Sequence, residues 1–295
     1  MLVPVGRAVG LELEAAGLAV AELDAQLGAH ARDAGLEVGD IIIKADGQAV
    51  PNAAALQEAV DRSKGGLVLT VLRNGEEMNV TVTPVEHEGC RRLGIYVREG
   101  IAGVGTVTYY DPETGAFGAL GHGVSDAHGN LLPLQAGSAM EAEIISVKKG
   151  RAGTPGQLQG SFQKDAVLGE LEKNTRCGIF GVTSAGWAGI PLPVAEVSQI
   201  HTGPATILSN VTGTEVQEYS VEILKLYPGE KACGRNLLLH VTDAALLEAT
   251  GGIVQGMSGS PIIQDGKFIG AVTHVLVNDP TTGYGIFLET MLGAA

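Results

Sequence analysis

A serine flanked by glycines in the last part of the chain has the clearest chemical meaning. The segment Gly252–Pro261 reads G-I-V-Q-G-M-S-G-S-P and precedes a predicted strand, Lys267–Val277. A serine nucleophile must present its hydroxyl on a tight turn, with backbone N–H groups directed at the position where the oxyanion forms. The pattern therefore predicts Ser258 as a nucleophile, with the N–H groups of Gly256 and Ser258 as an oxyanion hole. An ordinary glycine–serine turn between strands is the alternative.

A serine nucleophile needs a base, and two histidines are candidates. His122 lies in A-L-G-H-G-V-S-D, directly after the predicted strand Gly115–Leu120, where a rigid element can hold an imidazole at its end. His274 lies on the strand that follows the serine, and we expect its side chain to point into a core or to line a pocket. The sequence favours His122 as the base.

The third group of such a site is a carboxylate that fixes the tautomer of the histidine. Asp243 lies in H-V-T-D-A-A-L-L, between the predicted strand Leu237–Val241 and Ser258. A short helix is predicted to begin there, so Asp243 could equally act as its N-cap. Asp126 and Asp265 are further candidates, because they are close in sequence to the histidine and the serine.

Composition limits the classes of protein to be considered. The chain has 295 residues, 45% of them hydrophobic, and 19 Lys and Arg against 33 Asp and Glu give a formal net charge of -14. Such a length is typical of two domains, and such hydrophobicity argues against disorder. The negative charge argues against nucleic acid or an anionic membrane surface as the main partner. The 43 glycines, without a collagen period, indicate a turn-rich β protein.

The cysteines predict neither a metal site nor a disulfide framework. Cys90, Cys177 and Cys233 lie far apart, without C-x-x-C spacing, and their number is odd. We interpret them as small buried apolar residues.

The uncharged stretch Cys177–Ala195 contains several glycines and prolines, which predict buried strands and turns rather than a membrane helix. The opening residues Met1–Gly10 lack the basic and apolar regions of a signal peptide.

Two regions differ in their predicted elements. Residues 1–86 combine strands with two short helices, at Ala29–Ala34 and Asn52–Ser63, and with hairpin turns at Asp46-Gly47 and Asn74-Gly75. Residues 87–295 show short strand-like runs between turn signals and one helix, Asp243–Ala249. Many strands with few helices predict an antiparallel barrel or sandwich.

The first region resembles a PDZ domain of the bacterial, protease-associated kind. The pattern G-L-x-x-G-D-x-I-x-x-x-[DN]-G within Ala34–Val50 carries the resemblance, which covers residues 1–86. In PDZ domains a peptide adds as an extra strand, and a backbone loop holds its terminal carboxylate. The matching loop is Val9, Gly10 and Leu11, for which plain strand entry and core is the alternative. Whether a free C-terminus or an internal segment would bind stays open.

The combined motifs resemble the SpoIVB peptidase family. They are the PDZ-like region, G-A-L-G-H, then K-G-x-x-G-x-P-G at Lys149–Gly156, a late Asp, and G-M-S-G-S-P. The resemblance implies a mainly β protein, with a PDZ domain at 1–86 and a chymotrypsin-like double β-barrel at 87–295. It also implies a serine endopeptidase with His122, Asp243 and Ser258 as the triad and no metal or organic cofactor.

The resemblance further implies a role in sporulation signalling. The expected partners are the chain itself, cleaved near its N-terminus and recognised by the PDZ domain, and a SpoIVFA-like regulatory subunit of an intramembrane protease complex. Cleavage of that subunit would lead to activation of a late sporulation sigma factor. The implied location is the space between the two membranes around the forespore, reached by secretion and with a membrane anchor in longer forms. One alternative is a PDZ-based binding or signalling module with little peptidase turnover. Another is an HtrA-type quality-control protease, in which the PDZ domain follows the catalytic domain.

Overall fold

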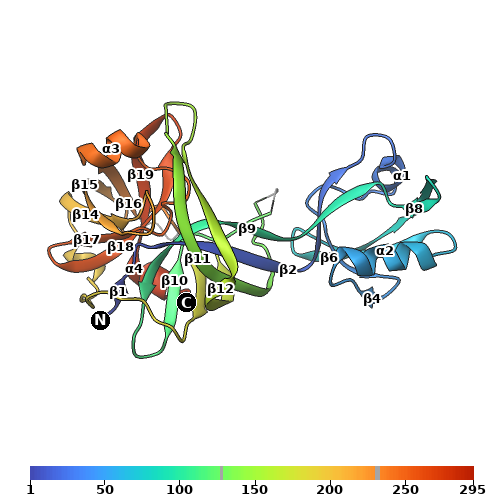
Figure 1. Ribbon diagram of the computed structural model, residues 1–295, viewed down its shortest axis with the longest axis horizontal. Helices are drawn as coiled ribbons and strands as arrows, with labels where there is room; N and C mark the ends of the chain where they lie inside the picture. Colours follow the sequence, from blue (N-terminus) through green and yellow to red (C-terminus); the bar gives the residue numbers. More distant parts are fainter. Residues whose placement is uncertain (127–128, 230–232) are drawn as a thin grey trace. The chain divides into compact units, whose positions relative to one another are not determined.

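The computed structural model describes residues 1–126, 129–229 and 233–295, which fold mainly into strands (Figure 1). The contacts divide the chain into two compact units. Unit 1 contains Met1–Glu12, Ala102–Val124 and Gly137–Ala295, and unit 2 contains Leu13–Ile101 and Ser125–Ala136. The long strands β2 (Ala8–Leu23) and β9 (Ile95–Tyr110) contribute residues to both units. The units therefore divide the chain differently from the predicted boundary after residue 86.

Unit 2 contains an antiparallel sheet in the order β2-β3-β5-β6, in which β4 pairs with β3. Asp46 and Gly47, like Asn74 and Gly75, all have positive φ, as a two-residue type I′ hairpin requires. Both predicted hairpins are thus confirmed. The elements are α1 (Ala29–Asp33), β3 (Ile41–Ala45), β4 (Gln48–Ala49), α2 (Ala53–Arg62), β5 (Leu67–Arg73), β6 (Glu76–Val82), and the separate hairpin β7 (Val85–His87) and β8 (Cys90–Arg92).

Asp40, the aspartate of the G-D pair in the PDZ-like motif, forms a buried ion pair. The Asp40 side chain is 1% exposed and accepts two hydrogen bonds from Arg73, at 2.6 Å and 2.7 Å. The Asp40 hydrogen bond is also the main cause of the raised pKa of Arg73.

Helix α2 begins at Ala53 because Asn52 caps it, with the Asn52 side chain accepting the N–H of Ala55 at 2.9 Å. The predicted helix and its cap are therefore confirmed.

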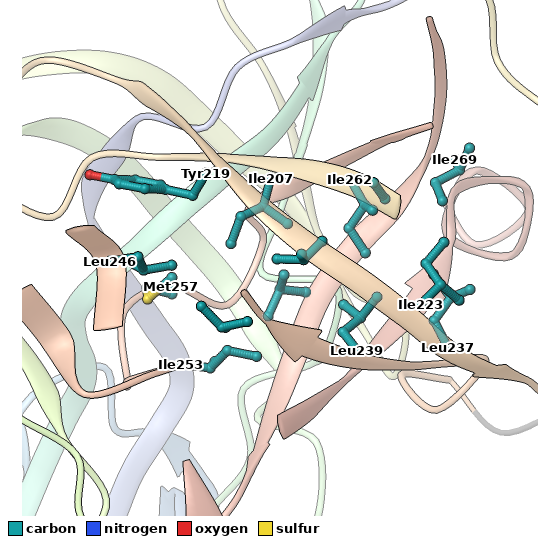
Figure 2. Packing of buried hydrophobic residues seen from close by; sticks show 14 of the residues in the cluster. Ile207, Tyr219, Ile223, Leu237, Leu239, Leu246, Ile253, Met257, Ile262 and Ile269 are labelled. Atoms are coloured by element: carbon teal, nitrogen blue, oxygen red, sulfur yellow. The ribbon is translucent and has the colours of Figure 1, made fainter. Parts of the chain in front are cut away.

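Unit 1 contains a closed antiparallel barrel in the order β14-β15-β16-β19-β18-β17. Its interior is filled by branched aliphatic side chains, among them Ile207, Leu239 and Ile262 (Figure 2). The barrel confirms the sequence prediction of a barrel or sandwich. Its strands are β14 (Gly203–Ser209), β15 (Gln217–Leu226), β16 (Leu237–Val241), β17 (Pro261–Gln264), β18 (Lys267–Leu276) and β19 (Asp279–Phe287), accompanied by η1 (Val197–Gln199), α3 (Ala244–Thr250) and α4 (Leu288–Leu292).

The other strands of unit 1 belong to a large antiparallel sheet. The pairings run β1-β9-β10-β13-β12-β11-β2, and β2 also pairs with β9. The pairings therefore form a closed ring of six strands: β9, β10, β13, β12, β11 and β2. The remaining strands are β1 (Val3–Pro4), β10 (Ala116–Ala119), β11 (Leu134–Lys148), β12 (Gln157–Thr175) and β13 (Gly178–Val182).

The interpretation of the cysteines is corrected. Cys177, in the turn between β12 and β13, forms a disulfide with Cys233, which precedes β16 in the sequence. Cys90 is free and exposed rather than buried. The bonded pair is separated by 56 positions in the sequence, so tertiary structure, not local spacing, brings the two thiols together.

Among the described residues, no helix has the length and apolar character to span a membrane.

Candidate active site

Ser258 lies on a tight turn between α3 and β17. Gly256 and Gly259 have φ values of 100° and 99°, a region that favours glycine. Between them, Met257 is fully buried in the barrel core and anchors the turn (Figure 2). The Ser258 hydroxyl is partly accessible and donates a hydrogen bond to the Thr273 carbonyl at 2.8 Å. The segment thus has the glycine-dependent geometry that the sequence predicted.

The two predicted oxyanion donors are unpaired. In residues 1–126, 129–229 and 233–295, neither the Gly256 N–H nor the Ser258 N–H donates a hydrogen bond. Leu158 donates its N–H to the Gln255 carbonyl at 2.8 Å. In a trans peptide the N–H points opposite to the carbonyl, so this bond fixes the direction of the Gly256 N–H. The arrangement leaves two backbone donors available for a developing negative charge.

Thr106 of β9 holds this turn, and sequence reasoning missed it. Its hydroxyl donates to the Gly256 carbonyl at 2.7 Å, and its N–H donates to the Ser258 carbonyl at 3.2 Å. The Thr106 carbonyl accepts the N–H of Leu120 at 3.1 Å. A threonine within a run of alternating strand residues gives no local signal for such a role.

His122 follows β10 on a turn in which Leu120 and Gly121 both have φ of 68°. Its Nδ1 lies 3.0 Å from the Gly123 carbonyl. Because a carbonyl can only accept, Nδ1 carries the proton and Nε2 presents a lone pair. Burial lowers the pKa of His122, with a smaller opposing effect from the Gly123 hydrogen bond. The imidazole is therefore neutral at neutral pH, as a general base must be.

The turns that carry Ser258 and His122 are in contact. A Cβ on Gly259 would lie 2.1 Å from the Thr106 carbonyl oxygen and 2.7 Å from the Leu120 nitrogen. Gly259 follows the serine directly, and Leu120 lies two positions before the histidine. The absence of a side chain at Gly259 therefore lets the turn that carries Ser258 approach the turn that carries His122.

His274, the second candidate base, lies beside His122. The two ring centroids are 5.1 Å apart, and the preceding residue, Thr273, accepts the Ser258 hydrogen bond. Desolvation lowers the pKa of His274, and the proximity of His122 and Arg235 lowers it further. The residue as a whole is exposed, although desolvation of its ring is the largest cause of the lowered pKa. His274 thus belongs to the surroundings of the site, beside the imidazole that the sequence favoured.

Asp243 caps helix α3. One carboxylate oxygen accepts the Leu246 N–H at 3.0 Å, and the other accepts the Ser220 N–H at 3.3 Å. Asp243 lies two positions beyond the end of β16, and among the described residues no hydrogen bond or ion pair joins it to His122.

The two further carboxylates have other partners. Asp265 accepts a hydrogen bond from His201 Nε2 at 2.8 Å. Asp126 accepts the Asn130 N–H at 2.9 Å within unit 2. The described ring partner of His122 is thus the Gly123 carbonyl.

The predicted peptide-binding residues Val9, Gly10 and Leu11 require a correction. All three are buried in β2 within unit 1. A Cβ on Gly10 would lie 2.4 Å from the Phe162 ring of β12. They are buried residues of a strand that pairs with β3, β9 and β11, as the alternative interpretation of strand entry and core held. Alternation of apolar residues is the same for a buried barrel strand and for a peptide-binding edge.

Unit 2 instead contains a groove elsewhere, with a volume of about 360 Å³. Helix α2 forms one side, and the first residues of β9 form the other. Arg92 lines the groove and donates to the Gln57 side chain at 3.1 Å. The lining consists of Asp24, Leu27, Ala53, Leu56, Gln57, Val60, His87, Arg92, Leu93, Gly94, Ile95, Tyr96 and Val97.

A protein-family model described as SpoIVB peptidase S55 matches residues 89–292. Most of the chain, including the Ser258 and His122 turns, falls in this range, so the protein is a serine peptidase. More particularly, the chain belongs to the SpoIVB peptidase S55 family. The resemblance found in the sequence is confirmed.

Other similarities are partial. A probable periplasmic serine endoprotease DegP-like protein of Halomonas elongata is 46% identical over 69 residues, which are 23% of this chain and 14% of that protein. The solved structure of the Rv3671c protease in an inactive form has a TM-score of 0.37 and 15% identity, covering 65% of this chain and 82% of that one. The active form from M. tuberculosis has a TM-score of 0.36 and 15% identity, covering 66% and 73%.

Proposed function

We propose that this protein is an endopeptidase in which Ser258 is the nucleophile and His122 the general base. The observation that carries the proposal is the contact between their two turns, with two unpaired N–H groups on one and a free Nε2 on the other. Membership in the peptidase family supports the reaction class.

The proposed reaction begins when the Ser258 hydroxyl turns from the Thr273 carbonyl towards His122. Nε2 takes the hydroxyl proton as the oxygen attacks the scissile carbonyl, and the N–H groups of Gly256 and Ser258 bind the oxyanion. The imidazolium then protonates the leaving amine, and water hydrolyses the acyl-enzyme. The sequence assigns the orientation of His122 to Asp243, whereas the geometry supports the Gly123 carbonyl.

The proposed fold follows the family resemblance. The peptidase part is a chymotrypsin-like pair of barrels, supported by the closed β14–β19 barrel and by the ring of pairings through β9, β10, β13, β12, β11 and β2. The domain that contains helix α2 and the Asp40–Arg73 pair is of the PDZ kind, supported by the sheet order and the groove beside α2.

The proposed biological role also rests on the resemblance. The substrates are the chain itself and a SpoIVFA-like regulatory subunit of an intramembrane protease complex, and cleavage of that subunit activates a late sporulation sigma factor. The proposed site of action is the space between the two membranes around the forespore. No cofactor takes part in the proposed steps.

Labelling by a fluorophosphonate tests the nucleophile. We expect the parent protein to gain the mass of one probe and the Ser258→Ala variant to gain none, because an activated serine is needed to attack phosphorus. Intact-mass spectrometry measures both. Ser198→Ala, which changes an exposed serine of the same unit, is the control and should label like the parent. Equal labelling of Ser258→Ala and the parent would refute the assignment.

A second candidate function, peptide binding, is favoured by the groove in unit 2. Its lining contains apolar side chains such as Leu56 and Ile95, and Arg92 supplies a positive charge opposite in sign to that of Asp24 in the same lining. These features suit an extended peptide with an apolar side chain and a carboxylate. In this alternative the chain acts as a binding or signalling module, and full signalling by Ser258→Ala in cells would favour it.

Reversing the charge at Arg92 tests the groove. We expect Arg92→Glu to weaken binding of a fluorescent peptide with a free C-terminal carboxylate by about tenfold, the usual size of one charge-assisted contact. Fluorescence anisotropy measures the affinity, and an amidated peptide gives the contribution of the carboxylate. Lys64→Glu makes the same change of charge outside the groove and is the control. Equal losses in the two variants would show only a general charge effect.

A further inference from the structure

Thr106 is a buried threonine whose polar groups serve the nucleophile turn. The residue is 1% exposed, and both its hydroxyl and its N–H donate to carbonyls on either side of Met257. We propose that the Thr106 hydroxyl is a positioning group that holds the oxyanion hole in its open geometry. This inference rests on the proposed function, because it assumes that Gly256 and Ser258 supply the oxyanion donors.

Each carbonyl of the turn is bonded, and this fixes the directions of the two free N–H groups. Leu158 holds the Gln255 carbonyl, and the Ser260 N–H donates to the Met257 carbonyl at 3.0 Å. Thr106 holds the other two, those of Gly256 and Ser258. Since each peptide group is planar, a bonded carbonyl also fixes the N–H at the other end of the same group.

The Thr106 hydroxyl binds the carbonyl of the peptide group between Gly256 and Met257. The preceding peptide group carries the Gly256 N–H, and the following one carries the Ser258 N–H. The Met257 N–H of this middle peptide group donates to the Val254 carbonyl at 3.1 Å. Gly256 has φ of 100°, and glycine resists rotation less than other residues. Without the hydroxyl, the Gly256 carbonyl loses its partner, and the Met257 N–H is the one bond that still holds this peptide among the described residues, so the spacing of the two donors is fixed less firmly.

The same strand provides a matched control. Thr108 is also fully buried, and within the described part of the chain its hydroxyl has no hydrogen-bond partner. Replacing either threonine by valine removes one buried hydroxyl and keeps the branched shape. The two changes differ in whether the hydroxyl reaches the nucleophile turn.

We expect Thr106→Val to lower kcat by about 10- to 100-fold with KM within about threefold, because misplaced oxyanion donors weaken transition-state binding. Thr106→Ser, which keeps the hydroxyl, should recover most of the loss, and Thr108→Val should keep parental kcat. Steady-state cleavage of a peptide substrate gives both constants. Circular dichroism melting shows whether each variant is folded at the assay temperature.

The outcomes separate this inference from the function on which it rests. Parental kcat in folded Thr106→Val would overturn the positioning role alone, as would equal losses in Thr106→Val and Thr108→Val. If Thr106→Val does not fold, Thr106→Ser decides: a folded serine variant with low kcat contradicts the role, and one with parental kcat supports it. Turnover that survives Ser258→Ala would instead overturn the proposed function itself.

Discussion

Replacing His122 with alanine is expected to lower kcat/KM by about 10⁶-fold, the loss typical of removing the histidine base from a serine peptidase. The imidazole is neutral, its Nδ1 is bonded to the Gly123 carbonyl, and no hydrogen bond to its Nε2 is present among the described residues. His274 is the neighbouring alternative, since its pKa is also lowered and it has a hydrogen bond with the Gly234 backbone. Cleavage of a peptide substrate by purified variants measures the effect.

Two comparisons make the His122 result specific. His274→Ala removes an exposed neighbouring imidazole and should cost far less activity; a loss as large as that of His122→Ala would assign the base to His274. Asp243→Ala removes the cap of α3 and should lower the unfolding free energy by about 1 kcal/mol, with kcat/KM within about tenfold of the parent. A 10⁴-fold loss in folded Asp243→Ala would mean that Asp243 reaches His122 during catalysis.

Replacing Gly259 with alanine is expected to destabilise unit 1 and to abolish turnover. The new Cβ would lie 2.1 Å from the Thr106 carbonyl oxygen, where no Cβ can be accommodated without moving backbone. A φ of 99° adds strain of about 1–3 kcal/mol for a residue with a side chain. We expect a total loss of more than about 3 kcal/mol in unfolding free energy. Chemical denaturation and peptide cleavage measure the two effects.

The chain offers a control for the strain itself. Gly266 also has a positive φ, of 72°, but a Cβ there would meet nothing within 4 Å. Gly266→Ala should therefore cost only the conformational strain and leave kcat unchanged. If Gly259→Ala were no less stable than Gly266→Ala, the close contact between the two turns would not be present in solution.

The features that the sequence predicted well depend on neighbouring residues. The turns at Asp46-Gly47 and Asn74-Gly75 follow from residues that tolerate positive φ, and α2 begins where Asn52 can bond its first turn. The glycines beside Ser258 likewise report a backbone geometry that few other residues adopt. In each case a few adjacent residues contain the whole physical cause.

The features that the sequence did not predict depend on residues far apart in the chain. Alternation in Val9–Leu13 predicts a strand, but not that β2 is buried against β12. Thr106 contacts a residue 150 positions away, and the Cys177–Cys233 pairing joins residues 56 positions apart. At Asp243 the local sequence does not decide between two roles, because a carboxylate just before a helix is equally compatible with an N-cap and with a catalytic group.

The order of the segments has a consequence for synthesis on the ribosome. Unit 1 combines Met1–Glu12 with segments that begin at Ala102 and continue to the last residue, whereas most of unit 2 is one continuous segment. Continuous segments fold early during translation, and contacts between distant segments form late. Strands β18 and β19, which close the barrel beside Ser258, emerge after the other four strands of that barrel. A partly synthesised chain that lacks these two strands therefore lacks a complete nucleophile site.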